Sequence, residues 1–231
     1  AGSASEIGPT AGRIGIRIDP ARPARFAVQV RIPGWARGAA MPSDLYRFVD
    51  RDTAPVRVSV NGKAVSAAPE RGYVRIERLW KSGDRVALEL PMPVRRVGAH
   101  PGVVADRGRV ALQRGPIVYC AEAVDQNGRG VLSRFLPDDA PVSARARPEL
   151  LGGIVALEAP ARAVARSNDG AVSAGETAPM VFVPYACWAN RARGEMAVWI
   201  AREAGAAQLP PLPTYARTAR WSASGGVGLE S

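Results

Sequence analysis

The sequence has very few of the residues that most often bind metals or carry catalysis, with one histidine and two cysteines in 231 residues. A structural zinc site uses about four protein ligands and a catalytic zinc site about three. Cys120 and Cys187 stand alone and far apart, and His100 is the only histidine. No stretch approaches the roughly 18 apolar residues that indicate a membrane-spanning helix. We therefore predict no metal ligand, no bound cofactor and no membrane partner for this chain.

Lysine is also scarce, occurring only at Lys63 and Lys81, so arginine supplies nearly all of the positive charge behind the formal net charge of +10. Such an excess can indicate a polyanionic partner such as nucleic acid. Several arginines instead alternate with apolar residues, as on a solvated sheet face. They are Arg13, Arg17, Arg57, Arg75, Arg85 and Arg109. We predict no nucleic-acid partner, and salt-sensitive binding of acidic polymers is the weaker alternative.

No segment has a long apolar stripe with the 3.6-residue period of a helix. Apolar residues recur instead at every second position, which puts them on one face of a half-buried strand. The clearest segments of this kind are 14–18, 26–32, 56–60 and 86–90. Asn61-Gly62 predicts a two-residue hairpin turn, since both turn positions need a positive φ, and Ser82-Gly83-Asp84 predicts another turn. The chain is predicted to be all-β.

The strands are predicted to form two consecutive β-sandwich domains of a jelly-roll-like kind, 1–97 and 98–205, followed by a Pro/Gly/Ser-rich C-terminal tail, 206–231. The first ends with Leu90-Pro-Met-Pro-Val94, whose prolines cannot donate to a sheet and belong at an edge or between domains. Two stretches rich in Pro, Ala and Arg, 137–148 and 159–179, are predicted to be long loops. The clearest strands of the second domain are 110–112, 117–121, 154–157, 181–183 and 196–200.

Both cysteines lie in apolar, strand-like runs, which favours two buried free thiols. A disulfide between Cys120 and Cys187 stays open, because spacing in the sequence does not give the distance between their Cα atoms. Residues 1–5 lack the basic start and apolar run of a signal peptide. Since no initiator methionine is present, we expect a processed or excised piece of a longer protein, and the compartment is left open.

Four blocks of sequence carry a family resemblance. They are Arg31-Ile-Pro-Gly-Trp-Ala36, Gly72-Tyr-Val-Arg-Ile-Glu-Arg-Leu-Trp-Lys-Ser-Gly-Asp84, Gly108-Arg-Val-Ala-Leu-Gln-Arg-Gly-Pro-Ile-Val-Tyr-Cys-Ala-Glu122 and Pro184-Tyr-Ala-Cys-Trp-Ala-Asn-Arg191. In this order, over about residues 12–202, they resemble the C-terminal β-rich part of bacterial β-L-arabinofuranosidases, which form glycoside hydrolase family 127. The resemblance implies two β-sandwich domains that follow a helical catalytic barrel.

The same resemblance implies that the chemistry lies in the barrel. There a cysteine nucleophile is held by zinc together with further cysteines, two of them adjacent, and a glutamate, while a separate glutamate acts as acid/base. Nothing in this sequence matches that set, so no catalytic, cofactor-binding or metal-binding residue is carried over. The chain is predicted to be a non-catalytic portion that packs against and supports the barrel, and a homodimer is left open.

Three features invite a catalytic interpretation and favour a simpler one. His100 lies in a Gly/Pro-rich connection without a serine nucleophile motif, so a solvent or interdomain histidine is expected. A glycosidase needs two carboxylates about 5–9 Å apart. Among the carboxylates of this chain, Glu122 and Asp125 are the pair that least resembles ordinary solvated residues of a strand face. A non-catalytic role is still expected for them, because a β-sandwich seldom encloses its own cleft. Asn190-Arg191 is expected to form a turn with charge-assisted backbone bonds. The other carboxylates considered are Glu70, Glu77, Asp84 and Asp106.

Five tryptophans support an alternative function, a carbohydrate-binding module that tethers a glycosidase to arabinose-containing glycans. Exposed indole rings would stack on sugar rings, whereas buried ones would serve the core. Trp35, Trp80 and Trp188 are expected in the core, and Trp221 is expected to be exposed. Trp199 is expected to face either the second sheet or a partner domain. A glycan therefore stays open as a partner.

Overall fold

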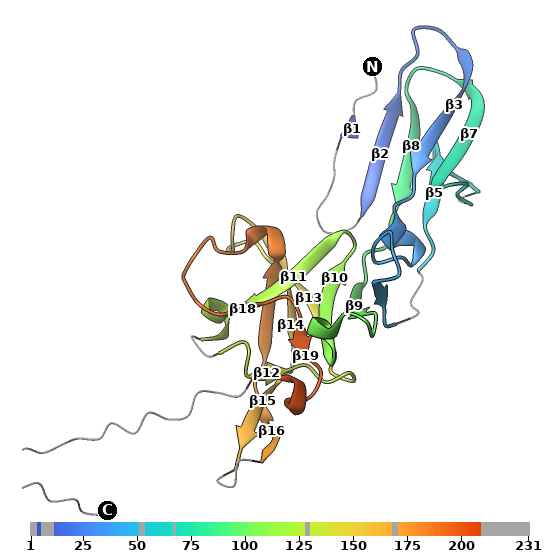
Figure 1. Cartoon of the computed structure of the whole chain (residues 1–231). Coiled ribbons are helices and arrows are strands. Elements are labelled where there is room, and N and C mark those ends of the chain that lie inside the picture. Colours follow the sequence, from blue (N-terminus) through green and yellow to red (C-terminus); the bar gives the residue numbers. More distant parts are fainter. Residues whose placement is uncertain are drawn as a thin grey trace, which may run out of the picture.

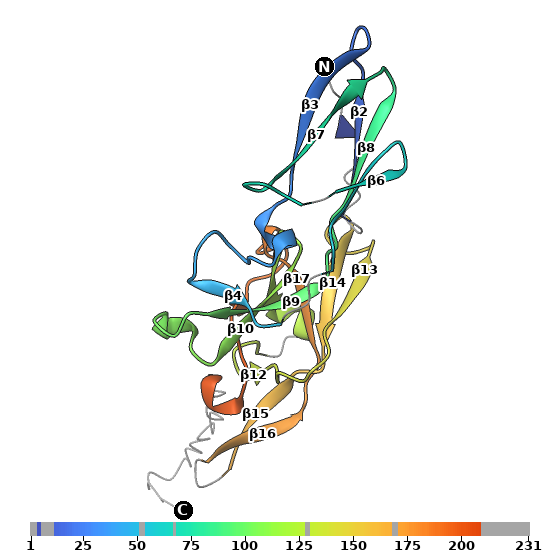
Figure 2. The ribbon, with the colours of Figure 1, turned by 90° about the vertical axis from the view of Figure 1, so that its right-hand side faces the viewer.

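A computed structural model describes residues 4–5, 12–50, 54–66, 68–127, 130–167 and 171–208. All regular structure in these ranges is strand or short 3-10 helix, so the all-β prediction is confirmed. In the two views of Figures 1 and 2 the strands form two bodies that lie end to end. Within the described residues, no helix has the length and apolar character needed to span a membrane.

The first body is a sandwich of a five-stranded and a two-stranded sheet (Figure 1). The larger sheet has the order β1-β2-β8-β5-β6. The smaller consists of β3 (Ala24–Arg31) and β7 (Tyr73–Trp80), which pair antiparallel along their full length. The strands of the larger sheet are β1 (Ala4–Ser5), β2 (Arg13–Ile18), β5 (Arg57–Val60), β6 (Lys63–Val65) and β8 (Asp84–Glu89). The 3-10 helix η1 (Gly34–Arg37) follows β3.

The core of this sandwich follows from the period-2 pattern. On β7, Val74, Ile76 and Trp80 are buried while the residues between them are largely exposed. Trp80 is fully buried, and its indole Nε1 donates to the backbone oxygen of Phe26 at 2.9 Å, which joins β7 to β3. Burial of each such side chain contributes about 1.5–3 kcal/mol. The full set of buried core residues is Val30, Ile32, Val58, Val60, Val74, Ile76, Trp80, Val86, Leu88 and Leu90.

Both predicted turns are present. Asn61 has a φ of 50° and Gly62 of 78°, and they connect β5 to β6 with Val60 paired to Lys63. Positive φ at both positions is what the Asn-Gly pair predicts. Ser82-Gly83-Asp84 turns the chain from β7 into β8, and this turn crosses between the two sheets of the sandwich.

The second body is a twelve-stranded sheet (Figure 2). Its main path is β13-β14-β17-β11-β10-β19-β12-β15-β16, with β18 paired to β11 and β9 paired to both β10 and β4. Its strands are β4 (Tyr46–Phe48), β9 (Val94–Ala99), β10 (Arg109–Arg114), β11 (Ile117–Glu122), β12 (Arg134–Phe135), β13 (Ser143–Arg147), β14 (Ile154–Ala159), β15 (Arg162–Arg166), β16 (Val172–Thr177), β17 (Met180–Pro184), β18 (Met196–Ala197) and β19 (Ile200–Ala201). The remaining 3-10 helices are η2 (Val104–Asp106), η3 (Ala123–Gln126), η4 (Tyr185–Cys187) and η5 (Ala204–Ala206).

The second body has its own hydrophobic core, separate from that of the first. Side chains from β10, β11, β14, β17 and β19 meet there. They include Leu112, Tyr119, Leu157, Met180 and Phe182, each at most 1% exposed. The prolines that were expected at an edge or between domains, Pro91 and Pro93, lie where the chain leaves the first body's larger sheet and enters the second through β9. β9 spans the predicted boundary between residues 97 and 98.

Two predictions about the second body are wrong. The stretches 137–148 and 159–179 are not long loops, because they contain β13, β15 and β16. β13 and β16 are exposed at almost every position, so no apolar alternation marks them, and backbone pairing forms them. The segment 196–200 is not one strand either: it divides into β18, paired with β11, and β19, paired with β10.

The prediction for the arginines holds for five of the six. Arg13, Arg17, Arg57, Arg75 and Arg85 are exposed on strand faces. Arg109 is half-buried instead, because its Nη1 donates to the backbone oxygen of Trp199 at 3.3 Å. The predicted tail, 206–231, lies outside the described residues from residue 209 onward.

Candidate functional site

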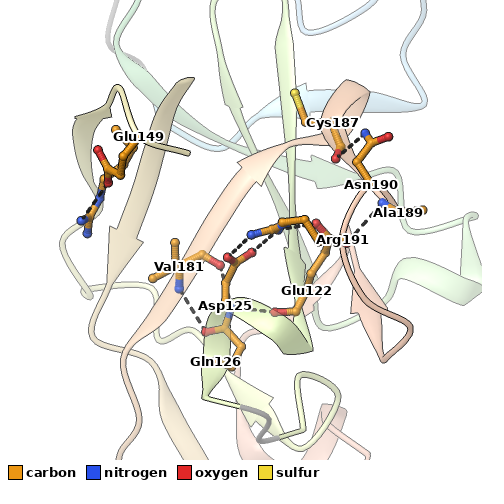
Figure 3. Close-up of polar contacts among 10 residues, drawn as sticks. Glu122, Asp125, Gln126, Glu149, Val181, Cys187, Ala189, Asn190 and Arg191 are labelled. Carbon is orange, nitrogen blue, oxygen red and sulfur yellow. Dashed lines mark hydrogen bonds and ion pairs between the residues drawn. The ribbon is translucent and has the colours of Figure 1, made fainter. Parts of the chain in front are cut away.

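The carboxylates of Glu122 and Asp125 meet at one guanidinium, that of Arg191 (Figure 3). Glu122 ends β11, Asp125 lies in η3, and Arg191 comes from the segment that follows η4. Nη2 of Arg191 donates to Glu122 Oε2 at 2.7 Å and to Asp125 Oδ2 at 2.6 Å, and Nη1 donates to Asp125 Oδ1 at 2.5 Å. Sequence reasoning named this carboxylate pair and missed its partner, which lies 66 and 69 residues away.

This ion-pair cluster is largely removed from water. The side chains of Glu122, Asp125 and Arg191 are 5%, 9% and 19% exposed. The hydrogen bonds that Arg191 donates to Asp125 are the main cause that raises the pKa of Arg191, and burial opposes them. Buried charges cost several kcal/mol each in desolvation, and the cluster offsets this cost only because every charge has a close partner. Arg191 lies between the two carboxylates and bonds to both. The three side chains of Glu122, Asp125 and Arg191 therefore form a structural ion-pair cluster, which we call the clamp.

Backbone bonds hold the segments around the clamp. The side chain of Gln126 makes two hydrogen bonds to the backbone of Val181 in β17. Its Nε2 donates to Val181 O at 2.7 Å, and its Oε1 accepts from Val181 N at 3.1 Å. On the other side, Glu122 Oε1 accepts from Ala189 N at 3.2 Å. Asn190 makes the expected turn, donating to Cys187 O and Trp188 O. The expectation for Arg191 was wrong, since its guanidinium bonds to carboxylates rather than to backbone.

Trp188 was expected in the core and is 43% exposed instead. β17 ends at Pro184, and η4 then turns the chain outward, so the apolar run that includes Trp188 leaves the sheet. Tyr185, 45% exposed, stacks on Trp188 with ring centroids 5.8 Å apart and planes 12° apart. The two rings form an exposed aromatic pair directly beside the clamp.

The other tryptophans are placed differently. Trp80 is buried, as expected, and Trp35 is half-buried against the same core. Trp199 packs on the ring of Tyr46 in β4, with centroids 5.3 Å apart, so it faces a strand of its own sheet. Trp221 lies outside the described residues.

A hollow of about 300 Å³ opens beside the clamp. Trp188 forms one of its walls, and its charged groups come from Glu122, Arg191, Arg193 and Glu195. The carboxylate of Glu195 accepts from the backbone N–H groups of Val131 at 2.7 Å and Leu132 at 3.1 Å, which holds this rim in place. The remaining lining residues are Ala123, Ala189, Ala192 and Gly194.

His100 lines a separate and larger hollow of about 760 Å³ between β4, β9 and β10. The histidine is exposed, and its Nδ1 accepts from Gly102 N at 3.1 Å within its own turn. Asp106 on the same rim accepts from the hydroxyl of Tyr46 at 3.4 Å. The arginines around this hollow are Arg47, Arg107, Arg109 and Arg202.

The remaining candidates are scattered. Glu77 pairs with Arg75, and Asp84 accepts from Lys81 N and from Asn61, all in the first body. Glu70 also lies there, beside Tyr73. Among the described residues, no three His, Cys, Asp or Glu side chains lie together as metal ligands would.

Both cysteines are free thiols. Cys120 is buried in β11, and burial is the main cause that raises the pKa of its thiol to about 12. Cys187 was expected to be buried in a strand; it is half-buried in η4 instead, since the chain has left β17 by then.

The described chain is thus an all-β segment with two separate main cores and a buried ion-pair clamp. Two family models match it: the β-L-arabinofuranosidase GH127 middle domain over residues 5–92 and the glycoside hydrolase family 127 C-terminal domain over residues 94–201. The chain belongs to glycoside hydrolase family 127, and the resemblance of its four sequence blocks is confirmed.

Three relatives illustrate the match. The non-reducing end β-L-arabinofuranosidase of Bifidobacterium longum subsp. longum is 38% identical over 185 residues, 74% of this chain and 25% of the relative. The structure of a GH127 β-arabinofuranosidase is 37% identical with a TM-score of 0.83, covering 90% of this chain and 32% of that one. A GH127 β-L-arabinofuranosidase from Geobacillus stearothermophilus T6 is 37% identical with a TM-score of 0.73, covering 86% and 30%. The chain therefore spans a quarter to a third of the length of these relatives.

Proposed function

We propose that this chain is the non-catalytic β-sandwich portion of a β-L-arabinofuranosidase-like glycoside hydrolase, and that it packs against and supports a helical catalytic barrel. The observation that carries the proposal is the clamp. The carboxylate pair that most resembled a glycosidase pair is held by Arg191, with all three side chains mostly buried. The names of the relatives support release of L-arabinofuranose by the parent enzyme, through a part outside this segment.

The first test is an assay of the purified chain on an aryl β-L-arabinofuranoside, with zinc and a thiol reductant present. The expected result is no turnover above the buffer rate, because Arg191 holds the carboxylates of Glu122 and Asp125, the pair that most resembled a glycosidase pair. The proposal would be wrong if hydrolytic activity co-purified with the chain and persisted in a Glu122→Gln variant. That result would mean that other residues of the chain are catalytic.

The second test addresses support of the barrel. This chain replaces the matching quarter of the Bifidobacterium longum enzyme, and the same enzyme truncated before that quarter is the control. The expected result is that the chimera is soluble and active, whereas the truncated enzyme aggregates or loses activity. Equal activity of the truncated enzyme would show that the barrel needs no support from a segment of this kind.

A further inference from the structure

We propose that the hollow beside the clamp, with Trp188 as its wall, binds a neutral sugar. A supporting role toward a barrel does not require such a site, so this inference goes beyond the proposed function. The hollow is about 300 Å³, the lower end of the range for small-molecule sites. That volume suits one or two sugar rings.

The aromatic wall supplies the apolar part of the recognition. A pyranose or furanose presents a face of C–H groups that packs on an aromatic ring, while its hydroxyls point outward. Trp188 and Tyr185 are both more than two-fifths exposed, although large aromatic side chains are usually well covered. Their stacking holds the indole plane in one orientation, so little conformational entropy is lost when a ligand packs on it.

The segment that carries the rings is held by hydrogen bonds on both sides of Trp188. Trp188 N donates to Tyr185 O at 3.0 Å, and Ala189 has a φ of 63°. The next residues are held by Asn190, which bonds back to the turn, and by Arg191, which makes three short bonds to Glu122 and Asp125. A rigid surface that exposes aromatic rings is the arrangement expected of a preorganised binding site.

Charge decides the class of ligand. The chain as a whole carries +10, yet the residues that line the hollow include two carboxylates and two guanidiniums, whose charges balance. A polyanion finds no net positive charge here, and the arginine-rich rim of the other hollow would suit it better. Carboxylate and guanidinium groups side by side provide acceptors and donors for hydroxyls. The concave shape favours a small ligand over the flat face of a second protein domain.

The test measures tryptophan fluorescence of the whole chain during titration with L-arabinose and with soluble arabinan, and measures retardation of the chain in gels that contain arabinan. We expect saturable binding that changes little with salt. Trp188→Ala should weaken it by about tenfold, which corresponds to about 1.4 kcal/mol, since the ring that packs on the sugar is lost. Arg193→Ala should weaken it by a smaller factor.

The matched control is Tyr73→Ala, which removes an aromatic ring of similar exposure, 37%, from the outer face of the β3–β7 layer. This variant should bind like the unchanged chain. Binding that survives Trp188→Ala would overturn the proposal. So would the absence of any saturable response to either sugar, or binding of polygalacturonate alone that disappears as salt rises.

The alternative explanation for the exposed rings of Tyr185 and Trp188 is that they contact the barrel. The chimera described above distinguishes this contact from a sugar site. If acrylamide quenches Trp188 in the chimera as it does in the isolated chain, and Trp188→Ala weakens retardation of the chimera in arabinan gels, the sugar site stands. If the ring becomes inaccessible and Trp188→Ala no longer changes the retardation, the aromatic pair is a contact between domains and the sugar site falls. Activity of the chimera reports on the supporting role independently of either outcome.

Discussion

Arg191 and Asp125 form a two-point ion pair, with Nη1 to Oδ1 at 2.5 Å and Nη2 to Oδ2 at 2.6 Å (Figure 3). The geometry matches the two donors of a guanidinium to the two oxygens of a carboxylate. The pair ties the segment after η4 to η3, and Glu122 extends it to the end of β11. One side chain thus holds three segments of the second body.

The first prediction concerns this clamp. Arg191→Ala should lower the free energy of unfolding by about 3 kcal/mol, because it leaves two buried carboxylates without their partner. This is the lower end of the range for a buried pair, since Arg191 keeps 19% of its side chain exposed. Urea denaturation followed by circular dichroism measures it. The control is Arg193→Ala, on an exposed residue of the same segment, which should stay within about 0.5 kcal/mol. A loss for Arg191→Ala no larger than the control's would mean that the clamp does not stabilise the fold.

The second prediction concerns acid. Hydrogen bonds from Lys81 N and the Asn61 side chain lower the pKa of Asp84 below its ordinary value of 3.8, and those from Ser82 and Gly83 lower the pKa of Asp19 in the same way. A lowered pKa in the folded state stabilises the fold above the unfolded pKa, and this stabilisation is lost as pH falls through the folded pKa. The urea midpoint should therefore drop as pH falls below about 4. A double Asp19→Asn, Asp84→Asn variant should show a shallower drop; an unchanged slope would assign the acid sensitivity to other groups.

The third prediction concerns the thiols. With a pKa of about 12, Cys120 has only about one part in 10⁴ as thiolate at pH 8 and is also buried. Iodoacetamide should therefore modify Cys187 first and Cys120 only after unfolding. Peptide mapping by mass spectrometry measures both sites. Cys187→Ser should abolish the early modification, and rapid labelling of Cys120 in the folded chain would contradict the buried position of β11.

The fourth prediction contrasts two tryptophans. Trp80→Ala should cost about 3–5 kcal/mol, because it empties the centre of the first core and removes the bond to Phe26 O. Trp188→Ala should cost no more than about 0.5 kcal/mol, since that ring is exposed. Thermal unfolding monitored by near-ultraviolet circular dichroism compares them. A large loss for Trp188→Ala would mean that the ring is packed in solution.

Sequence patterns predicted the parts of this fold that have one buried face. β5 and β8 show the expected alternation, and the Asn61-Gly62 turn has the expected backbone. The exposed strands β13 and β16 were missed, because a strand without a buried face carries no alternating pattern. The site was predicted in part: Glu122 and Asp125 were named together, whereas the guanidinium between them comes from a segment remote in sequence.

The sequence by itself determined the all-β class, the hairpin and the family, since period-2 alternation, turn residues and motif blocks are local properties of the chain. Only the tertiary structure decided that Arg191 meets Asp125 and that Trp188 is exposed while Trp80 is buried. These facts depend on the order of strands in the sheet, which brings β11 beside β17 and so places η3 near the segment after η4. Strand order is set by long-range packing rather than by any local pattern.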